Sequence, residues 1–243
     1  MLRSVSAEVL KLRHSRIWII LVVLPVISLV IGCANYYFNR EVLQQEWYSL
    51  WTQAALFYGM FFLPVLIAIC CAYACRLEHI NRNWNAVLTA PVSIASVIIA
   101  KLIVIGALLL FVQLIFFMLY FGMGHLLGIS SAFPSDAIGW VFRGWISSLA
   151  IAAIQLVLSL RIRSFAAPIG ICLCAVFLGL GLYVAKFGML LPYSMLTIGM
   201  GVLSQKSLNG AEHIQFYVIS GIYIVLFTSL AIRSLQRNDV IQA

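Results

Sequence analysis

Charged residues are scarce in this 243-residue sequence: only 9% are Asp, Glu, Lys or Arg, and only seven are acidic. A soluble domain usually carries about 25% charged residues, because its folded surface needs polar cover. The scarcity excludes an ordinary soluble enzyme, a disordered tail and a nucleic-acid-binding domain. Instead, 64% of the residues are hydrophobic and the mean hydropathy is +1.07, which indicates a polytopic membrane protein.

Motifs for catalysis and metal binding are also missing. The sequence has no GxxxxGK[ST] loop for ATP hydrolysis, no HExxH and no GxSxG. Its six cysteines form no CxxC pair and lie in or beside apolar runs, so we interpret them as small buried membrane residues. Its four histidines lack carboxylates in a ligand pattern. We expect no catalytic residue, no cofactor site and no metal site in this chain.

Six apolar stretches are long enough to cross a bilayer core of roughly 30 Å, which takes about 20 helical residues. Lipid requires that backbone polar groups be paired internally, and these runs do not alternate as barrel strands do, so helices are favoured. The fold class is therefore all-α, a single transmembrane domain over residues 1–243. The six expected spans are 17–38, 54–75, 97–120, 137–160, 166–185 and 214–232.

Lys and Arg are shared unequally between the two sides of this topology. Eleven fall on the side of the termini and four on the other side. Because basic residues concentrate in cytoplasmic segments, both termini are predicted to be cytoplasmic, in a plasma-membrane protein. The eleven are Arg3, Lys11, Arg13, Arg16, Arg76, Arg82, Lys101, Arg161, Arg163, Arg233 and Arg237; the four are Arg40, Arg143, Lys186 and Lys206.

Three segments outside the spans stand out. Residues 1–16 are amphipathic at helical spacing and predict an interfacial elbow helix, with an ordinary charged flank as the alternative. Residues 76–96 form the longest internal cytoplasmic connection, in which polar and apolar residues mix until Pro91 interrupts the pattern. This is the only sizeable segment that we expect to be available for binding a soluble partner. Residues 187–213 are too apolar for a solvated loop. We interpret them as two short half-helices re-entering the outer leaflet, rather than as a seventh span.

Polar residues inside the spans are few. Arg143 lies within two turns of the outer end of the fourth span, from which its side chain is expected to snorkel. Gln113 and Gln155 lie deeper, and we interpret them as interhelical hydrogen-bonding residues. A proton- or sodium-coupled transporter would need buried carboxylates, which the spans lack. Energy for any transport must therefore come from a separate ATPase.

Three segments carry a resemblance to a known family. The opening AEVLKLR of residues 7–13 resembles the elbow helix of permeases of the second ATP-binding-cassette (ABC) export type, with its E-x-L-K-x-R/K pattern. Residues 78–101, with EH, NWN and LTAP followed by a lysine, resemble the cytoplasmic loop of the subgroup that serves lantibiotic immunity and bacitracin resistance. The apolar segment around Pro192-Tyr193-Ser194 is similar to the outer re-entrant hairpin of that subgroup.

The resemblance implies a division of labour. Two six-span subunits, identical or related, would pair in the membrane lipid above two copies of a cytoplasmic ATPase that binds ATP and Mg²⁺. The helix between the second and third spans would then be the coupling helix. An aromatic anchor with charged neighbours suits such a docking helix, although Trp84 is also interpretable as an interface-belt tryptophan. The implied docking residues are Glu78, Arg82, Asn83 and Trp84, with Glu8 and Lys11 of the elbow helix nearby.

The resemblance also implies a function, expulsion of a cationic antimicrobial peptide as self-protection or resistance. Four carboxylates on the expected outer side, Glu41, Glu46, Asp136 and Glu212, could attract such a peptide, although they are equally ordinary loop residues. Two alternatives stay open. The same fold could export a lipid or a drug, or the chain could be a membrane scaffold or sensor that recruits a cytoplasmic partner without transport.

Overall fold

The computed structural model describes residues 1–13, 15–80, 84, 91–204 and 208–237. Helices account for nearly all of this part of the chain, and it contains no strand. Six of its helical segments are long and apolar enough to cross a membrane. The all-α class and the six expected spans are therefore confirmed.

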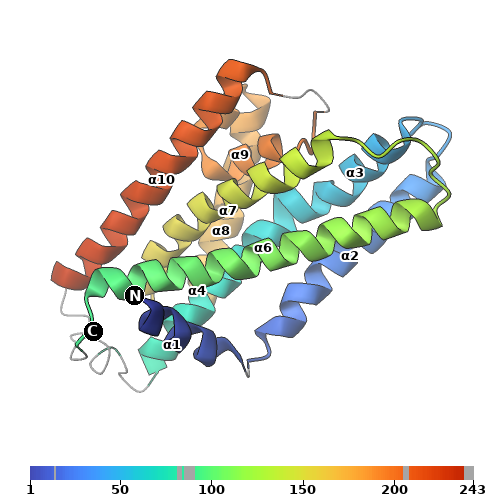
Figure 1. Ribbon diagram of the computed structural model, residues 1–243. Helices are drawn as coiled ribbons and strands as arrows, with labels where there is room; N and C mark the ends of the chain where they lie inside the picture. The colour runs from blue at the N-terminus through green and yellow to red at the C-terminus, as the bar shows by residue number, and fades with distance from the viewer. Residues whose placement is uncertain (14, 81–83, 85–90, 205–207, 238–243) are drawn as a thin grey trace.

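The helices form an elongated bundle, with one short helix lying across one end (Figure 1). The elements are α1 (Leu2–Arg13), α2 (Ile17–Phe38), α3 (Glu46–Phe57), the π-helical turn η1 (Tyr58–Phe62), α4 (Leu63–His79), α6 (Ile94–Leu126), α7 (Asp136–Arg161), α8 (Ala166–Val184), the 3-10 turn η3 (Gly188–Leu190), α9 (Pro192–Gly199) and α10 (Gly210–Arg237).

The two ends of the bundle differ. One end holds α1, the end of α4, the start of α6 and the end of α10, and is called here the α1 end (Figure 1). The other end holds α9 and the connections around residues 39–45 and 127–135, and is called the α9 end. The six spans alternate between these two ends.

The second span is longer than hydropathy predicts. It begins at Glu46 rather than at residue 54, because α3 continues through η1 directly into α4. The added turns carry Trp47, whose indole is buried against the rings of Tyr120 and Phe133. Packing against protein, rather than contact with lipid, therefore extends this helix beyond its apolar core.

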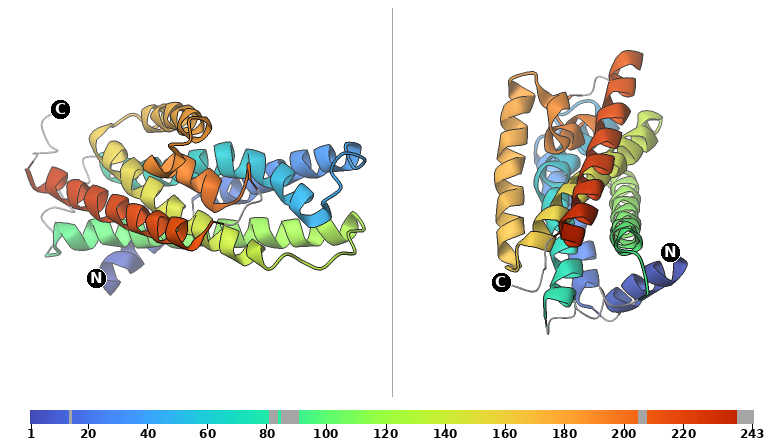
Figure 2. Two further views of the ribbon diagram at one scale, coloured as in Figure 1. Left: turned by 90° about the horizontal axis from the view of Figure 1, so that it is seen from above. Right: turned by 90° about the vertical axis from the view of Figure 1, so that its left-hand side faces the viewer.

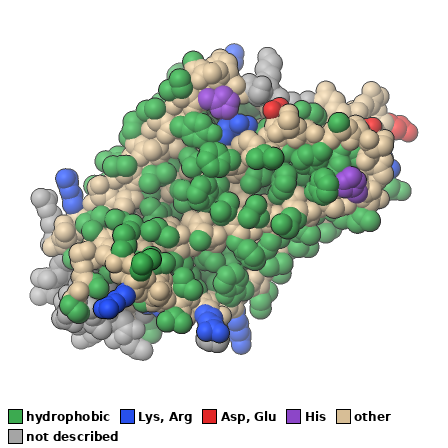
Figure 3. Space-filling view, viewed as in Figure 1, with side chains coloured by type: hydrophobic (Ala, Val, Ile, Leu, Met, Phe, Trp, Pro, Cys, Tyr) green, Lys and Arg blue, Asp and Glu red, His purple; other side chains and the backbone are tan. Residues whose placement is uncertain are grey.

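Helix α7 occupies the middle of the bundle, where it packs against α4, α6, α9 and α10 (Figure 2). Small residues such as Gly144, Ser148 and Ala152 are buried along it. Small side chains allow helix backbones to approach closely in membranes, where lipid supplies no hydrophobic drive between helices. In contrast, α8 and α10 are mostly exposed and apolar. Hydrophobic side chains cover the flank of the bundle in Figure 3, as contact with lipid requires.

Residues 187–204 form one short helix rather than the two half-helices expected. Turn η3 leads into α9, which is about 12 Å long and cannot cross a membrane. Gly201 ends it with a φ of +60°, and the amides of Gly201 and Val202 bond back to the carbonyls of Ile198 and Thr197. This is the Schellman pattern, which favours glycine at the left-handed position because glycine has no Cβ. Residues 187–204 therefore hold one short helix, which ends where Gly201 turns the chain.

Candidate functional site

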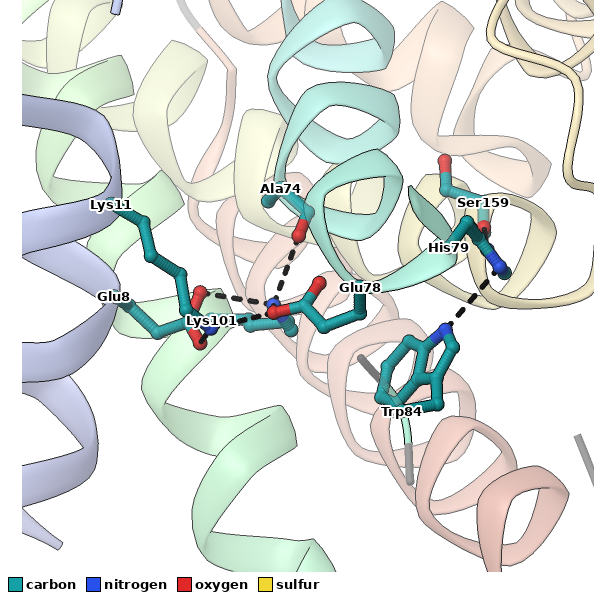
Figure 4. A network of polar contacts seen from close by, with 8 residues as sticks. All are labelled: Glu8, Lys11, Ala74, Glu78, His79, Trp84, Lys101 and Ser159. Carbon is teal, nitrogen blue, oxygen red and sulfur yellow. Dashed lines mark hydrogen bonds and ion pairs between the residues drawn. The ribbon is translucent and has the colours of Figure 1, made fainter. Parts of the chain in front are cut away.

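Two lysines and two glutamates from three helices meet at the α1 end (Figure 4). Glu8 and Lys11 come from α1, Glu78 from the last turn of α4 and Lys101 from the third turn of α6. We call these four residues the charge cluster. Its formal charges cancel, so it places no net charge at the end of the bundle.

Lys101 is the centre of the charge cluster, and its side chain is fully buried. Its Nζ donates to Glu78 Oε1 at 2.7 Å, to Glu8 Oε2 at 2.9 Å and to the Ala74 carbonyl at 3.0 Å. These acceptors use all three N–H groups of the ammonium. A buried charge is tolerated only when it is paired and hydrogen-bonded, so Lys101 depends on both carboxylates.

Lys11 closes the cluster from its rim. Its Nζ donates to Glu8 Oε1 and to Glu78 Oε1, both at 2.6 Å, and its side chain is about a third exposed. Glu78 is buried, and one of its oxygens accepts from both lysines. Of the five polar contacts, one joins α1 to α4, one joins α1 to α6 and two join α6 to α4, at the point where α4 ends; the fifth lies within α1.

Helix α1 presents its charged face to the protein. Glu8 is buried, and Ser4 Oγ lies 3.0 Å from Ser96 Oγ of α6. Leu2 and Val9 are 85% and 50% exposed, whereas Leu12 is buried. Charge pairing with Lys101 holds α1 to the bundle, and it leaves Leu2 and Val9 free to lie in a membrane interface.

A second set of contacts ties the chain beyond α4 to α7. Trp84 is buried, and its Nε1 donates to His79 Nδ1 at 3.3 Å (Figure 4). Because Nδ1 accepts this bond, Nε2 of the imidazole carries the proton and donates to the Ser159 carbonyl at 3.0 Å. Trp84 thus anchors the segment to its own bundle, by way of His79.

The structure brings together four of the six implied docking residues. Glu8, Lys11 and Glu78 share the charge cluster, and Trp84 lies beside it on His79. Arg82 and Asn83 lie outside the described residues. Sequence reasoning missed the structural roles of Lys101 and His79. The available signal was a lysine at the eighth position of an apolar helix. However, Lys101 was used only in the count of Lys and Arg that predicts the orientation in the membrane.

Polar contacts along α7 hold the short helix α9 and helix α6. Arg143 is buried, and its Nε donates to the Gly199 carbonyl at 3.0 Å, so the expected snorkelling to solvent is wrong. Gln155 donates from Nε2 to the Tyr193 hydroxyl at 2.7 Å. Burial raises the pKa of Tyr193, which keeps this hydroxyl protonated. Gln113 of α6 approaches Ser148 of α7 at 3.5 Å, an interhelical contact as expected.

These sites can hold helices together, and their residues offer no chemistry of bond making. Within the part of the chain that the structure describes, no three His, Cys, Asp or Glu residues gather as metal ligands. The geometry defines a multi-pass helical membrane protein with an internal charge cluster at one end.

Comparison with known proteins identifies the family. Residues 4–179, more than two thirds of the chain, match the sequence model of a family described as ABC-2 family transporter protein. The chain therefore belongs to the ABC-2 transporter family. It is a permease, the transmembrane subunit of an ABC transporter, which pairs with an ABC ATPase and is not itself the ATPase. The chain matches none of the curated proteins.

Proposed function

We propose that this permease serves an ATP-driven exporter that expels a cationic antimicrobial peptide from the membrane, and that ATPase motion enters through the segment after α4. The observation that carries the coupling proposal is the charge cluster with Trp84. It fixes α1, α4, α6 and α7 to one another where that segment begins. A push on the segment would therefore move four helices together.

We assign the α1 end to the cytoplasm of a plasma membrane. The eleven-to-four distribution of Lys and Arg supports this orientation, because the described residues of the larger set lie at the α1 end. Two exposed residues in opposite connections test it: Arg163 at the α1 end and Glu41 at the α9 end. In a cysteine-free background, Glu41→Cys should react with an impermeant thiol reagent in intact cells, and Arg163→Cys only after permeabilisation. The reverse pattern would invert the assignment.

The six residues implied for docking keep a role in this proposal, in two groups. Trp84, Glu78, Glu8 and Lys11 act as positioning residues, since their contacts lie inside the chain. Arg82 and Asn83 remain proposed contacts of the ATPase. The ATPase is proposed to bind in two copies, with ATP and Mg²⁺, below a pair of permeases that are identical or related.

The peptide substrate rests on the resemblance of residues 78–101 and of the Pro192 segment to permeases of lantibiotic immunity and bacitracin resistance. The four carboxylates of Glu41, Glu46, Asp136 and Glu212 all lie at the α9 end, proposed to be outside. An open hollow of about 630 Å³ lies there beside Glu46, Trp47 and Tyr48. A carboxylate next to aromatic rings suits a cationic, amphipathic ligand. Export of a lipid or drug is the alternative.

One complementation experiment tests coupling and substrate together. A strain lacking this gene should be more sensitive to a lantibiotic or bacitracin-type peptide, and wild-type chain should restore resistance. Trp84→Ala removes a buried ring and its bond to His79, a truncation that typically costs about 3–5 kcal/mol of stability. We expect it to reach the membrane yet to co-purify less ATPase and to restore little resistance.

Trp84→Phe is the matched control, because it keeps an aromatic ring at this position while it loses the N–H donor and part of the ring volume. It should retain most of the resistance. Normal resistance with Trp84→Ala, at a normal membrane level, would remove the coupling proposal. Unchanged peptide sensitivity of the deletion strain would contradict the proposal that the substrate is a peptide, and would favour a lipid or a drug. If, in addition, no ATPase co-purified with the wild-type chain, a scaffold would be favoured.

A further inference from the structure

Arg143 is a buried cation inside a membrane-spanning helix. It is the eighth residue of α7, about 10 Å along the axis from the start of that helix at the α9 end. Only 8% of its surface is exposed. An ionisable side chain at such a position is costly and needs a partner, so it marks a functional site by default.

The described part of the chain supplies Arg143 with too few partners. Its Nε donates to the Gly199 carbonyl, and no described residue accepts from the four N–H donors on Nη1 and Nη2. The ion pairs among the described residues all belong to the charge cluster at the other end of the bundle. Asp136, at the start of α7, forms no ion pair with the guanidinium. Within the described residues, the positive charge of the guanidinium therefore has no ion-pair partner.

Close packing around Arg143 depends on two glycines. Gly139 lies one turn nearer the α9 end, and a Cβ there would stand 3.0 Å from Nη1. Gly199 of α9 lies against the Arg143 stem, and a Cβ at Gly199 would meet both Arg143 and the ring of Phe216 in α10. Gly139 thus borders the guanidinium, and Gly199 borders the stem of the side chain where α7, α9 and α10 meet.

Apolar side chains flank the site on the lipid-facing surface. Ile138 and Phe142 of α7 are 72% and 50% exposed, and Val218 of α10 is 54% exposed. Helix α10 as a whole is the least buried of the six spans. A ligand that reaches the guanidinium from this side must place apolar chains along α7 and α10.

We propose that Arg143 binds the phosphate of a membrane lipid in the leaflet at the α9 end. A guanidinium matches phosphate oxygens with paired N–H donors, and its charge offsets the anion. The guanidinium is within reach of lipid headgroups, since its Nη1 lies against Gly139, one turn nearer the helix end, and the headgroup region of each leaflet is roughly 5–8 Å thick. The site is independent of the peptide proposed as substrate, because it faces lipid rather than the hollow beside Glu46.

The test uses purified full-length chain in detergent and three probes: dioleoyl phosphatidylglycerol, dioleoylglycerol, which lacks the phosphate, and inorganic phosphate, which lacks the chains. Binding is measured by native mass spectrometry and by the rise in melting temperature. Wild-type chain should retain phosphatidylglycerol at least tenfold more tightly than either other probe. Arg143→Gln should weaken that binding at least tenfold.

Two further variants keep the test sharp if Arg143→Gln unfolds. Gly139→Ala leaves every charge in place and adds a Cβ against Nη1, so it should weaken lipid binding several-fold without loss of the fold. Arg40→Gln removes an exposed arginine at the same end, and should change binding less than twofold. Equal binding of phosphatidylglycerol by Arg143→Gln and Arg40→Gln would overturn the proposal. If inorganic phosphate bound as tightly as phosphatidylglycerol, the site would recognise a phosphate group and the proposal that it binds a lipid would be wrong.

Discussion

Replacing Lys101 with methionine is expected to destabilise the protein by about 3–5 kcal/mol, the usual cost of removing one partner from a buried ion pair. Methionine is close to lysine in volume, so packing changes little. The loss is electrostatic, because Glu8 and Glu78 would remain buried with only Lys11 at the rim. Unfolding of the purified protein in detergent, followed by heat or denaturant, measures the change.

Two comparisons separate this electrostatic effect from a general effect of substitution. Lys186→Met removes an exposed lysine at the α9 end and should change stability by less than about 0.5 kcal/mol. The triple variant Glu8→Gln, Glu78→Gln, Lys101→Met removes the buried charges together, so it should recover most of the lost stability. A Lys101→Met protein as stable as Lys186→Met would mean that the cluster does not hold α1 to the bundle.

The spans were predictable from sequence because lipid imposes a length and a composition on each of them. Helix α2 runs from Ile17 to Phe38, as hydropathy predicts. The start of the second span at Glu46 was not predictable, because the first turns of this helix are stabilised by buried aromatic contacts rather than by lipid. Hydropathy predicts which part of a helix lipid can surround. It does not predict where other helices pack against the helix in place of lipid.

The charge cluster was only partly predictable. Glu8, Lys11 and Glu78 were recognised through motifs, but as surface residues for docking. Lys101 and Glu8 are 93 positions apart in sequence, so no local spacing shows that they meet. Arg143 was misjudged for a similar reason. Its partner is a backbone carbonyl of α9, and the path of that segment depends on a glycine turn at Gly201.

Gly32 is expected to tolerate no side chain, because it marks the closest approach of α2 to α3. A Cβ added there would lie 2.3 Å from the Cα of Ala54 and 2.6 Å from its amide nitrogen. Both are backbone atoms, so no side-chain rotation relieves the clash. One turn earlier, Ser28 Oγ donates to the Ala54 carbonyl at 2.9 Å, which holds the two helices at this spacing.

Gly32→Ala should therefore cost at least the 1–3 kcal/mol typical of overpacking, and Gly32→Val should cost more. Gly221→Ala in α10 is the matched control, because a Cβ there meets nothing within 4 Å. In a helix interior, alanine is favoured over glycine by up to about 1 kcal/mol, so the control should be neutral or stabilising. The same chemical change thus has opposite signs at two positions. Equal melting temperatures for Gly32→Ala and Gly221→Ala would show that α2 and α3 are free to separate, and that the contact between Ser28 and Ala54 does not fix their distance.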